Sequence, residues 1–488
     1  MKNSLLKIAI LSSDVTRIIS GGAKEFRIFF GSVLCTLFLL SNSSAQFQHR
    51  AYYGWITDLA SEGRPNDAWP STRIDDKLLN DYDVNLKFMH EMGLNEIVIW
   101  GLFVSREWPL DLKNAIDDTR KKQVLAIIEK AHQYNIKVLS GVGVYSWGFD
   151  AIIRANPEIA CPDNPSAMCL HHPESWEWQK KILDYNFSFP IDGVNLQSAD
   201  LGRCSCGESK GMKDLEYHAA LNQKVVRYIR QAYKGKIIGI SSWGMNISDT
   251  RDLPGLASMT NGVDYFTDVR GWNASPRQPD FRLRMIEAIK PCNLGTIGTP
   301  NIEPPQHWER DRWFLPTAKR AALDLQVLYR EGGRAVENFM HIKSNPGDEA
   351  TIRLQAAIEL KPLAKWDEEY KLILSKMFSP RSDDVRDQLF DLFVNAEDAY
   401  FENLKKYDPS LADISLEPLV SDKSGDPVYI LYQMSKEGMK KYLASIEKLI
   451  SKSENMKNKV GNNALMEKVT TCLRNTRKDI LYSLNKKN

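Results

Sequence analysis

The stretch Ile191–Cys206, IDGVNLQSADLGRCSC, decides the fold. It has the pattern of a buried strand that ends in the small residues Ser198 and Ala199. The carboxylate of Asp200 comes next, and then a loop with two cysteines separated by one residue. In α/β proteins, side chains that act on substrates gather at the carboxyl ends of parallel strands. The stretch therefore predicts a strand that carries an acid into an enzyme site.

The same unit, a short apolar run followed by an amphipathic helical stretch, recurs about every 30–45 residues on both sides of this stretch. The remaining predicted strands cover 52–57, 96–103, 137–145, 236–243, 263–269, 294–299 and 334–341. Predicted helices cover 76–92, 118–134, 175–185, 214–233, 282–289 and 316–330. Eight strands with helices between them predict an α/β fold, a (β/α)8 TIM barrel, over residues 46–345.

A doubly wound open sheet is the alternative architecture. Such a sheet usually has a glycine-rich phosphate loop after its first strand, and the segment GWITDLASEG at 54–63 does not have that pattern. Beyond residue 345 the chain is charged, rich in lysine and helical in period. Residues 346–488 are therefore predicted to form a helical C-terminal extension, with a polar break near 408–427.

The N-terminal 45 residues have the pattern of a signal peptide. Lys24 and Arg27 precede the apolar run 28–40, and small residues lead to Ala45. A membrane anchor is the alternative, but the run is shorter than the roughly 18–20 residues that span a bilayer. We expect an exported protein, periplasmic or secreted, without stable membrane insertion.

Six cysteines follow this leader, and four of them fall in two neighbouring loops: Cys161, Cys169, Cys204 and Cys206. In an exported protein such cysteines usually form disulfides. We expect Cys161 and Cys169 to pair with each other or with Cys204 and Cys206. A zinc site is the competing interpretation, but the C-x-C spacing is tighter than the usual C-x-x-C knuckle. The sequence thus predicts disulfides and no metal site.

Charge and motifs exclude several classes of function. The 64 basic and 62 acidic residues leave a net charge of +2, so no global field attracts nucleic acid. The eight histidines include no H-E-x-x-H pair, and no motif indicates a nucleotide, haem or flavin cofactor. We predict no cofactor.

Aromatic and polar residues gather at the predicted strand ends. Flat apolar faces and hydrogen-bonding groups are what a sugar ring requires. The alternative is that these tryptophans fill the barrel or pack under its helices. The predicted substrate-binding residues are Trp55, Trp100, Trp147, Trp243, Arg270, Trp272, Asn338 and His341.

Carboxylates at the strand ends suggest the chemistry. Cleavage of a glycosidic bond requires one protonated carboxyl group and a second, ionised one. Asp200, at the end of an apolar strand, is the predicted general acid, since burial raises the pKa of a carboxyl group. Asp268 is the predicted base or nucleophile, aided by Glu303 or Glu337. Each also has a structural interpretation: Asp268 as partner of Arg270 or Arg251, Glu337 as partner of Arg334 or of an interior residue, and Glu303 as a loop cap.

Two segments carry a family resemblance: DGVNLQSADLGRCSC at 192–206 and RWFLPTAKRAALDLQVLYREGGRAVENFMHI at 312–342. They resemble the superfamily of barrel glycoside hydrolases that contains the family 20 β-N-acetylhexosaminidases and the family 67 α-glucuronidases. The resemblance covers about residues 51–345. It implies a carbohydrate substrate, and in the α-glucuronidase layout Asp200, Asp268 and Glu303 match the catalytic carboxylates by position.

Two departures limit what the resemblance implies. The hexosaminidases end this strand in an Asp-Glu pair, whereas this chain has Ala199 and Asp200. The missing first acid argues against substrate-assisted attack by an acetamido group. Uncharacterised bacterial relatives carry a C-x-C-x-x-C loop, and here Ser209 takes the third cysteine's place, which argues against a metal knuckle.

The predicted function is an exported glycoside hydrolase, α-glucuronidase-like in layout, with Arg270 suited to a uronate carboxylate. Two other classes stay open. A glycan-binding protein would keep the tryptophans and tolerate loss of a carboxylate. A polysaccharide lyase would need a base of higher pKa, such as His307, His341 or Tyr145.

Overall fold

The computed structural model describes residues 45–61, 72–104, 107–198, 201–245, 247, 252–268, 279–290, 292–297, 313–338, 345–405, 431 and 434–486. Residues from Gln46 to Asn488 form one compact unit. The predicted signal peptide, apart from Ala45, lies outside the described residues. In the part of the chain that is described, no helix combines the length and the apolar character that crossing a membrane requires.

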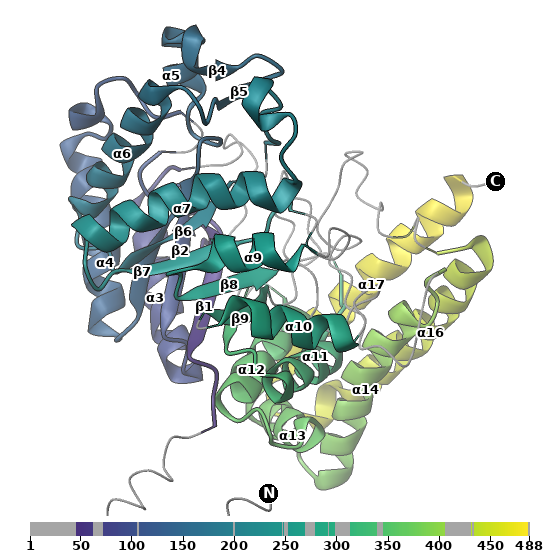
Figure 1. Cartoon of the computed structure of the whole chain (residues 1–488). Coiled ribbons are helices and arrows are strands. Elements are labelled where there is room, and N and C mark those ends of the chain that lie inside the picture. Colours follow the sequence, from purple (N-terminus) through teal and green to yellow (C-terminus); the bar gives the residue numbers. More distant parts are fainter. Residues whose placement is uncertain are drawn as a thin grey trace, which may run out of the picture. The chain divides into compact units, whose positions relative to one another are not determined.

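Eight parallel strands close into a barrel in the order β1-β10-β9-β8-β7-β6-β3-β2 (Figure 1). They are β1 (His49–Trp55), β2 (Glu96–Trp100), β3 (Lys137–Gly143), β6 (Gly193–Gln197), β7 (Ile237–Ser241), β8 (Tyr265–Asp268), β9 (Asn293–Ile297) and β10 (Ala335–Asn338). Each overlaps one predicted strand, and the predicted (β/α)8 barrel is confirmed. The opening stretch is β6, all five residues of which are buried.

Glycines make room for aromatic side chains inside the barrel. A Cβ atom on Gly141 of β3 would lie 2.2 Å from the indole of Trp100. One on Gly239 of β7 would lie 2.4 Å from the ring of Tyr265. A barrel of eight strands has an interior just wide enough for side chains to fill. Strands without side chains at these two points therefore allow large rings to enter it.

Helices follow the strands and cover the barrel (Figure 1). They are α3 (Asp76–Met92), α4 (Asp118–Gln133), α6 (Pro173–Phe187), α7 (Asp214–Ala232), α9 (Leu253–Thr260), α10 (Pro279–Ile289), α11 (Ala318–Glu331) and α12 (Pro346–Leu360). Helix α3 begins where the side chain of Asp75 accepts a hydrogen bond from the Leu78 N–H, and it ends at Gly93, whose φ of 81° favours glycine. These local stop and start residues explain why the predicted helix bounds agree closely with the structure.

The segment between β3 and α6 contains more structure than the sequence predicted. It holds the short helix α5 (Asp150–Ala155) and a two-stranded antiparallel hairpin of β4 (Ala160–Cys161) and β5 (Asn164–Met168). The sequence pattern predicted only a long loop here. Strands of two and five residues are too short to show a clear alternation.

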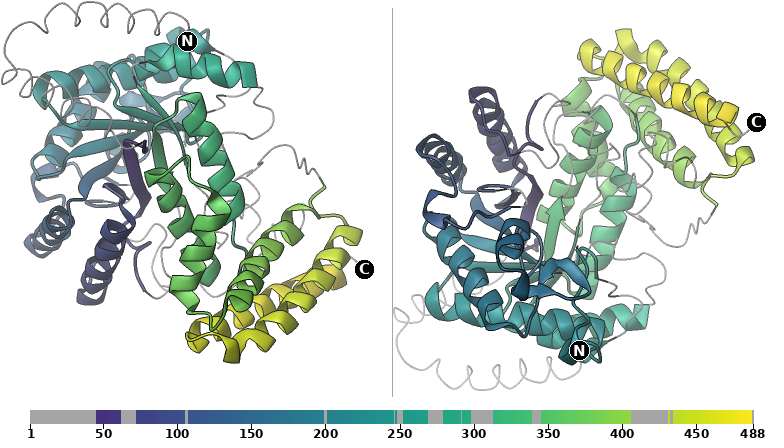
Figure 2. Two further views of the ribbon diagram at one scale, coloured as in Figure 1. Left: turned by 90° about the horizontal axis from the view of Figure 1, so that it is seen from below. Right: turned by 90° about the horizontal axis from the view of Figure 1, so that it is seen from above.

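The C-terminal region is helical, as predicted. After α12 come α13 (Trp366–Phe378), α14 (Asp383–Phe401), α16 (Lys436–Met456) and α17 (Asn463–Lys486). Helix α12 packs against α11 and α3 and so takes the place of the eighth barrel helix. Helices α16 and α17 lie side by side, as the yellow ribbons in Figure 2 show. The predicted polar break at 408–427 lies outside the described residues.

Candidate active site

Five aromatic side chains form a continuous group at the carboxyl ends of the barrel strands: Tyr53, Trp55, Trp100, Trp147 and Trp243, here called the aromatic wall. Trp55 and Trp100 are the last residues of β1 and β2 and are register partners, so their side chains face the same way. Their ring centroids lie 6.1 Å apart. Trp147 lies 5.6 Å from Trp55.

Tyr53 connects the two sides of the aromatic wall. Its ring lies 6.5 Å from Trp100 and stacks at 6.5 Å on Trp243, which follows β7. Trp55, Trp147 and Trp243 are half-buried, whereas Trp100 is 3 % exposed. The sequence prediction missed Tyr53. Its position two residues before Trp55 on the same face of β1 is the signal that would have identified it.

The turn after β3 holds Trp147 in an unusual backbone conformation. Tyr145 and Trp147 both have φ of 61°, in the left-handed region that bulky residues rarely adopt. A Cβ atom on Gly143 would lie 2.1 Å from the carbonyl oxygen of Ser146, so the turn folds directly over this glycine. The Met168 N–H donates to the Tyr145 carbonyl at 2.7 Å and ties the turn to the hairpin. Strained backbone of this kind is concentrated at functional sites.

Several buried polar atoms near the aromatic wall have no hydrogen-bond partner among the described residues. The indole Nε1 of Trp100 and the hydroxyl of Ser241 are two of them. Ser241 ends β7 in register with Thr267 of β8. Buried donors normally find a partner, so groups like these are suited to contact a bound polar molecule.

A polar network lies deeper in the barrel and centres on Glu337 of β10, which is fully buried. Its Oε1 accepts hydrogen bonds from Asn195 at 2.6 Å and from the Tyr265 hydroxyl at 2.9 Å. Its Oε2 accepts one from Thr267 at 2.6 Å. Burial, opposed by the bonds from Thr267 and Tyr265, raises the pKa of Glu337 to about 8. The carboxyl group is therefore mostly protonated at neutral pH.

The sequence prediction named Glu337 but not its partners. Asn195, Tyr265 and Thr267 stand at alternate positions of otherwise apolar strands, a pattern that indicates polar side chains facing the interior of a barrel.

Asp268, the predicted base or nucleophile, is the last residue of β8 and is 2 % exposed. The Ser242 hydroxyl donates to its Oδ1 at 3.3 Å. Because Thr267 reaches Glu337 inside the barrel, alternation along the strand places Asp268 on the opposite face of β8. Asp268 thus stands at the strand end that the prediction required, and its role on a substrate stays a prediction.

The other predicted residues divide into two sets. Asn338 ends β10 and is fully buried; its Nδ2 donates to Glu359 of α12 at 2.9 Å and to the Ala51 carbonyl at 3.2 Å, so it joins the barrel to α12. Five predicted residues lie outside the described residues: Asp200, Arg270, Trp272, Glu303 and His341.

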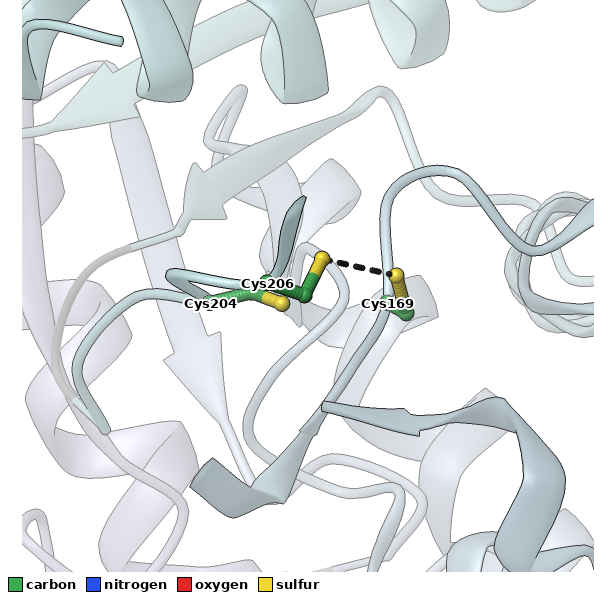
Figure 3. A group of neighbouring side chains, drawn as sticks. All are labelled: Cys169, Cys204 and Cys206. Carbon is green, nitrogen blue, oxygen red and sulfur yellow. Dashed lines mark hydrogen bonds between the residues drawn. The ribbon is translucent and has the colours of Figure 1, made fainter. Parts of the chain in front are cut away.

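Three of the four loop cysteines, Cys169, Cys204 and Cys206, lie together (Figure 3). Cys169 and Cys206 have Sγ atoms 3.4 Å apart, and Cys161 lies beside Cys204. All four are thiols in the structure, and the predicted disulfides stay a prediction. Within the described ranges, Cys169, Cys204 and Cys206 form a group of side chains that could hold a metal ion.

Comparison with known proteins assigns no family to this chain. No protein-family model and no curated protein sequence matches this chain. A solved mutant of the Thermobaculum terrenum O-GlcNAc hydrolase is similar with a TM-score of 0.47 and 10 % identity, over 84 % of this chain and 77 % of the other. The solved structure of CpGH84B has a TM-score of 0.48 and 9 % identity, over 90 % and 68 % of the two chains. Similarities at this identity and TM-score define neither a family nor a reaction.

Proposed function

We propose that this protein is a glycoside hydrolase that binds its substrate at the carboxyl ends of the barrel strands. The observation that carries the proposal is the aromatic wall. Its rings offer flat apolar surfaces, and the buried donors of Trp100 and Ser241 offer hydrogen bonds at the same end of the barrel. Sugars present apolar C–H faces and hydroxyl groups together, so this combination suits a carbohydrate.

The proposed chemistry uses two carboxylates from neighbouring parts of the barrel. Asp200 comes three residues after the end of β6, and Asp268 ends β8; β7 lies between these two strands. In glycosidases one such carboxyl group acts as general acid and the other activates water or attacks carbon. We propose these roles for Asp200 and Asp268, respectively.

We propose a uronic acid glycan as the first substrate class to test. Arg270 follows β8 by two residues, and its planar guanidinium suits a sugar carboxylate. We also propose that the chain is exported, on the basis of the leader 1–45. N-terminal sequencing of the exported protein should begin at Gln46, and an uncleaved N-terminus would contradict this.

Kinetics of single variants test the role of each group on a cleaved glycan. Asp200→Asn and Asp268→Asn should each lower kcat by about two orders of magnitude or more, because an amide can neither donate nor accept the transferred proton. Asp118→Asn is the control, since Asp118 is 91 % exposed on the outside of α4, and should retain wild-type kinetics.

The aromatic wall requires a separate variant. Trp243→Ala should raise KM by about 10-fold or more with a smaller change in kcat, since it removes a binding surface. Trp178→Ala, on the outer helix α6, is the matched control. Unchanged kcat in both Asn variants would refute the catalytic assignment, and an unchanged KM in Trp243→Ala would refute the binding site.

A further inference from the structure

We propose that Cys161, Cys169, Cys204 and Cys206 form a structural zinc site that fastens the loop after β6 to the hairpin β4–β5. This inference is independent of the proposed glycosidase activity. It also differs from the disulfides that the sequence predicted.

The distances between the sulfur atoms are the first evidence for a zinc site. The Sγ atoms of Cys169, Cys204 and Cys206 all lie within 4.8 Å of one another (Figure 3). Zinc bound tetrahedrally at a Zn–S distance of about 2.3 Å holds its sulfurs about 3.8 Å apart. The 3.4 Å between Cys169 and Cys206 is therefore close to the spacing around a zinc ion and far longer than a disulfide bond of about 2 Å.

Cys161 supplies the fourth ligand. It is buried, and its thiol donates a hydrogen bond to Cys204. This contact with Cys204 is the reason for including Cys161 in the proposed set of four cysteine ligands. Four thiolates are the usual ligand set of structural zinc, a metal that prefers sulfur and tetrahedral geometry.

Hydrogen bonds to the sulfur atoms are the second evidence for a zinc site. Cys169 accepts one from the backbone N–H of His171, and Cys204 accepts one from the backbone N–H of Cys206. Cys206 accepts hydrogen bonds from the backbone and the side chain of Ser209. Backbone donors aimed at sulfur stabilise thiolates, and outer groups of this kind orient the ligands of metal sites. A disulfide carries no charge and gains little from such donors.

Ser209 links these hydrogen bonds around the sulfur atoms to His171. His171 Nε2 lies 2.8 Å from the Ser209 hydroxyl, which in turn contacts Cys206. The chain of contacts links both cysteine-bearing loops. The Ser209 hydroxyl thus supports a proposed ligand, Cys206.

The zinc site would hold the loop that follows β6 in place. Cys204 follows Ser198, the residue after β6, by six positions, and Asp200 lies between them in the sequence. The hairpin on the other side is tied to the strained turn of Trp147 through Met168. Zinc at this point would hold the two segments together, and each coordinating thiol would release its proton on binding.

Metal analysis of the full-length protein, purified without chelator, tests the proposal. We expect about one zinc per chain by inductively coupled plasma mass spectrometry. Replacement of zinc by Co²⁺ should give a sulfur-to-cobalt charge-transfer band and the visible d–d bands of a tetrahedral site. The cobalt spectrum uses the unmodified chain and so does not depend on a variant that folds.

Variants locate the site. Cys169→Ser and Cys206→Ser should each retain less than about a tenth of the bound zinc, and Ser209→Ala should weaken zinc affinity by about 10-fold. Cys292→Ser is the matched control, because Cys292 is buried beside β9 and away from the cluster, and should retain the metal. Absence of metal together with disulfide-linked peptides Cys161–Cys204 and Cys169–Cys206 would overturn the proposal. A cobalt complex without the sulfur band would do the same.

Discussion

At the scale of single residues, the buried carboxyl group of Glu337 is the most informative. It is fully buried, and burial raises its pKa to about 8 from an ordinary value near 4.5. Between these two pH values the folded protein holds a proton that the unfolded chain has lost. Stability from this group is therefore complete below about pH 4.5 and falls as the pH rises toward 8, by up to about 1.4 kcal/mol per pH unit.

Glu337→Gln should remove this pH dependence. A glutamine side chain can accept from Asn195 and Tyr265 through its oxygen and donate to Thr267 through its nitrogen, so the network persists. The free energy of unfolding, measured by urea titration from pH 5 to pH 8, should fall with pH more steeply in the wild type than in the variant. Parallel curves would show that Glu337 is not the group that holds the proton.

At the scale of elements, the sequence predicted the strands and helices well and the site less completely. Strand β6 and its neighbours are continuous apolar runs between polar loops, so the local sequence pattern was sufficient to predict them. Asp75 and Gly93 mark the ends of α3 in the same way. The turn at Trp147 requires a positive φ at Tyr145 and Trp147, a conformation that bulky residues rarely adopt and that their identity therefore does not predict. The hairpin β4–β5 was not predicted because its strands are too short to show a clear alternation.

Strand β3 offers a prediction at this scale. Gly141→Ala should lower stability by about 2–3 kcal/mol, because the added Cβ would collide with the Trp100 indole inside the barrel. Gly211→Ala is the control, since nothing lies within 4 Å of its added Cβ, and it should change stability by about 0.5 kcal/mol or less. Urea unfolding followed by circular dichroism measures both, and equal effects would contradict the packing described.

At the scale of the whole chain, a buried acid joins the C-terminal helices to the barrel. Glu397 of α14 accepts hydrogen bonds from the backbone N–H groups of Lys319 and Arg320 at 3.0 and 2.8 Å, in the first turn of α11. It also pairs with the buried Arg320 side chain at 3.1 Å. Trp313 adds a second link, through Nε1 to Asp479 of α17 at 2.8 Å. The helical extension is therefore bound to the barrel by specific polar contacts.

Glu397→Ala should lower the free energy of unfolding by about 3–5 kcal/mol, because it leaves the Arg320 charge buried without this partner and removes a cap from α11. Glu368→Ala is the control, since this pair with Lys365 is exposed, and it should cost about 0.5 kcal/mol or less. Thermal unfolding of both variants measures the difference. A loss below about 1 kcal/mol in Glu397→Ala would contradict this role of Glu397.

The most direct measurement of the central proposal is the release of reducing sugar from neutral, amino and uronic acid glycans, with wild-type protein and Asp200→Asn side by side. We predict that at least one glycan is cleaved and that the variant still binds it but cleaves it more slowly by about 100-fold or more. Glycans that bind the wild type but are never cut would contradict the proposed hydrolase and make the barrel a glycan-binding module.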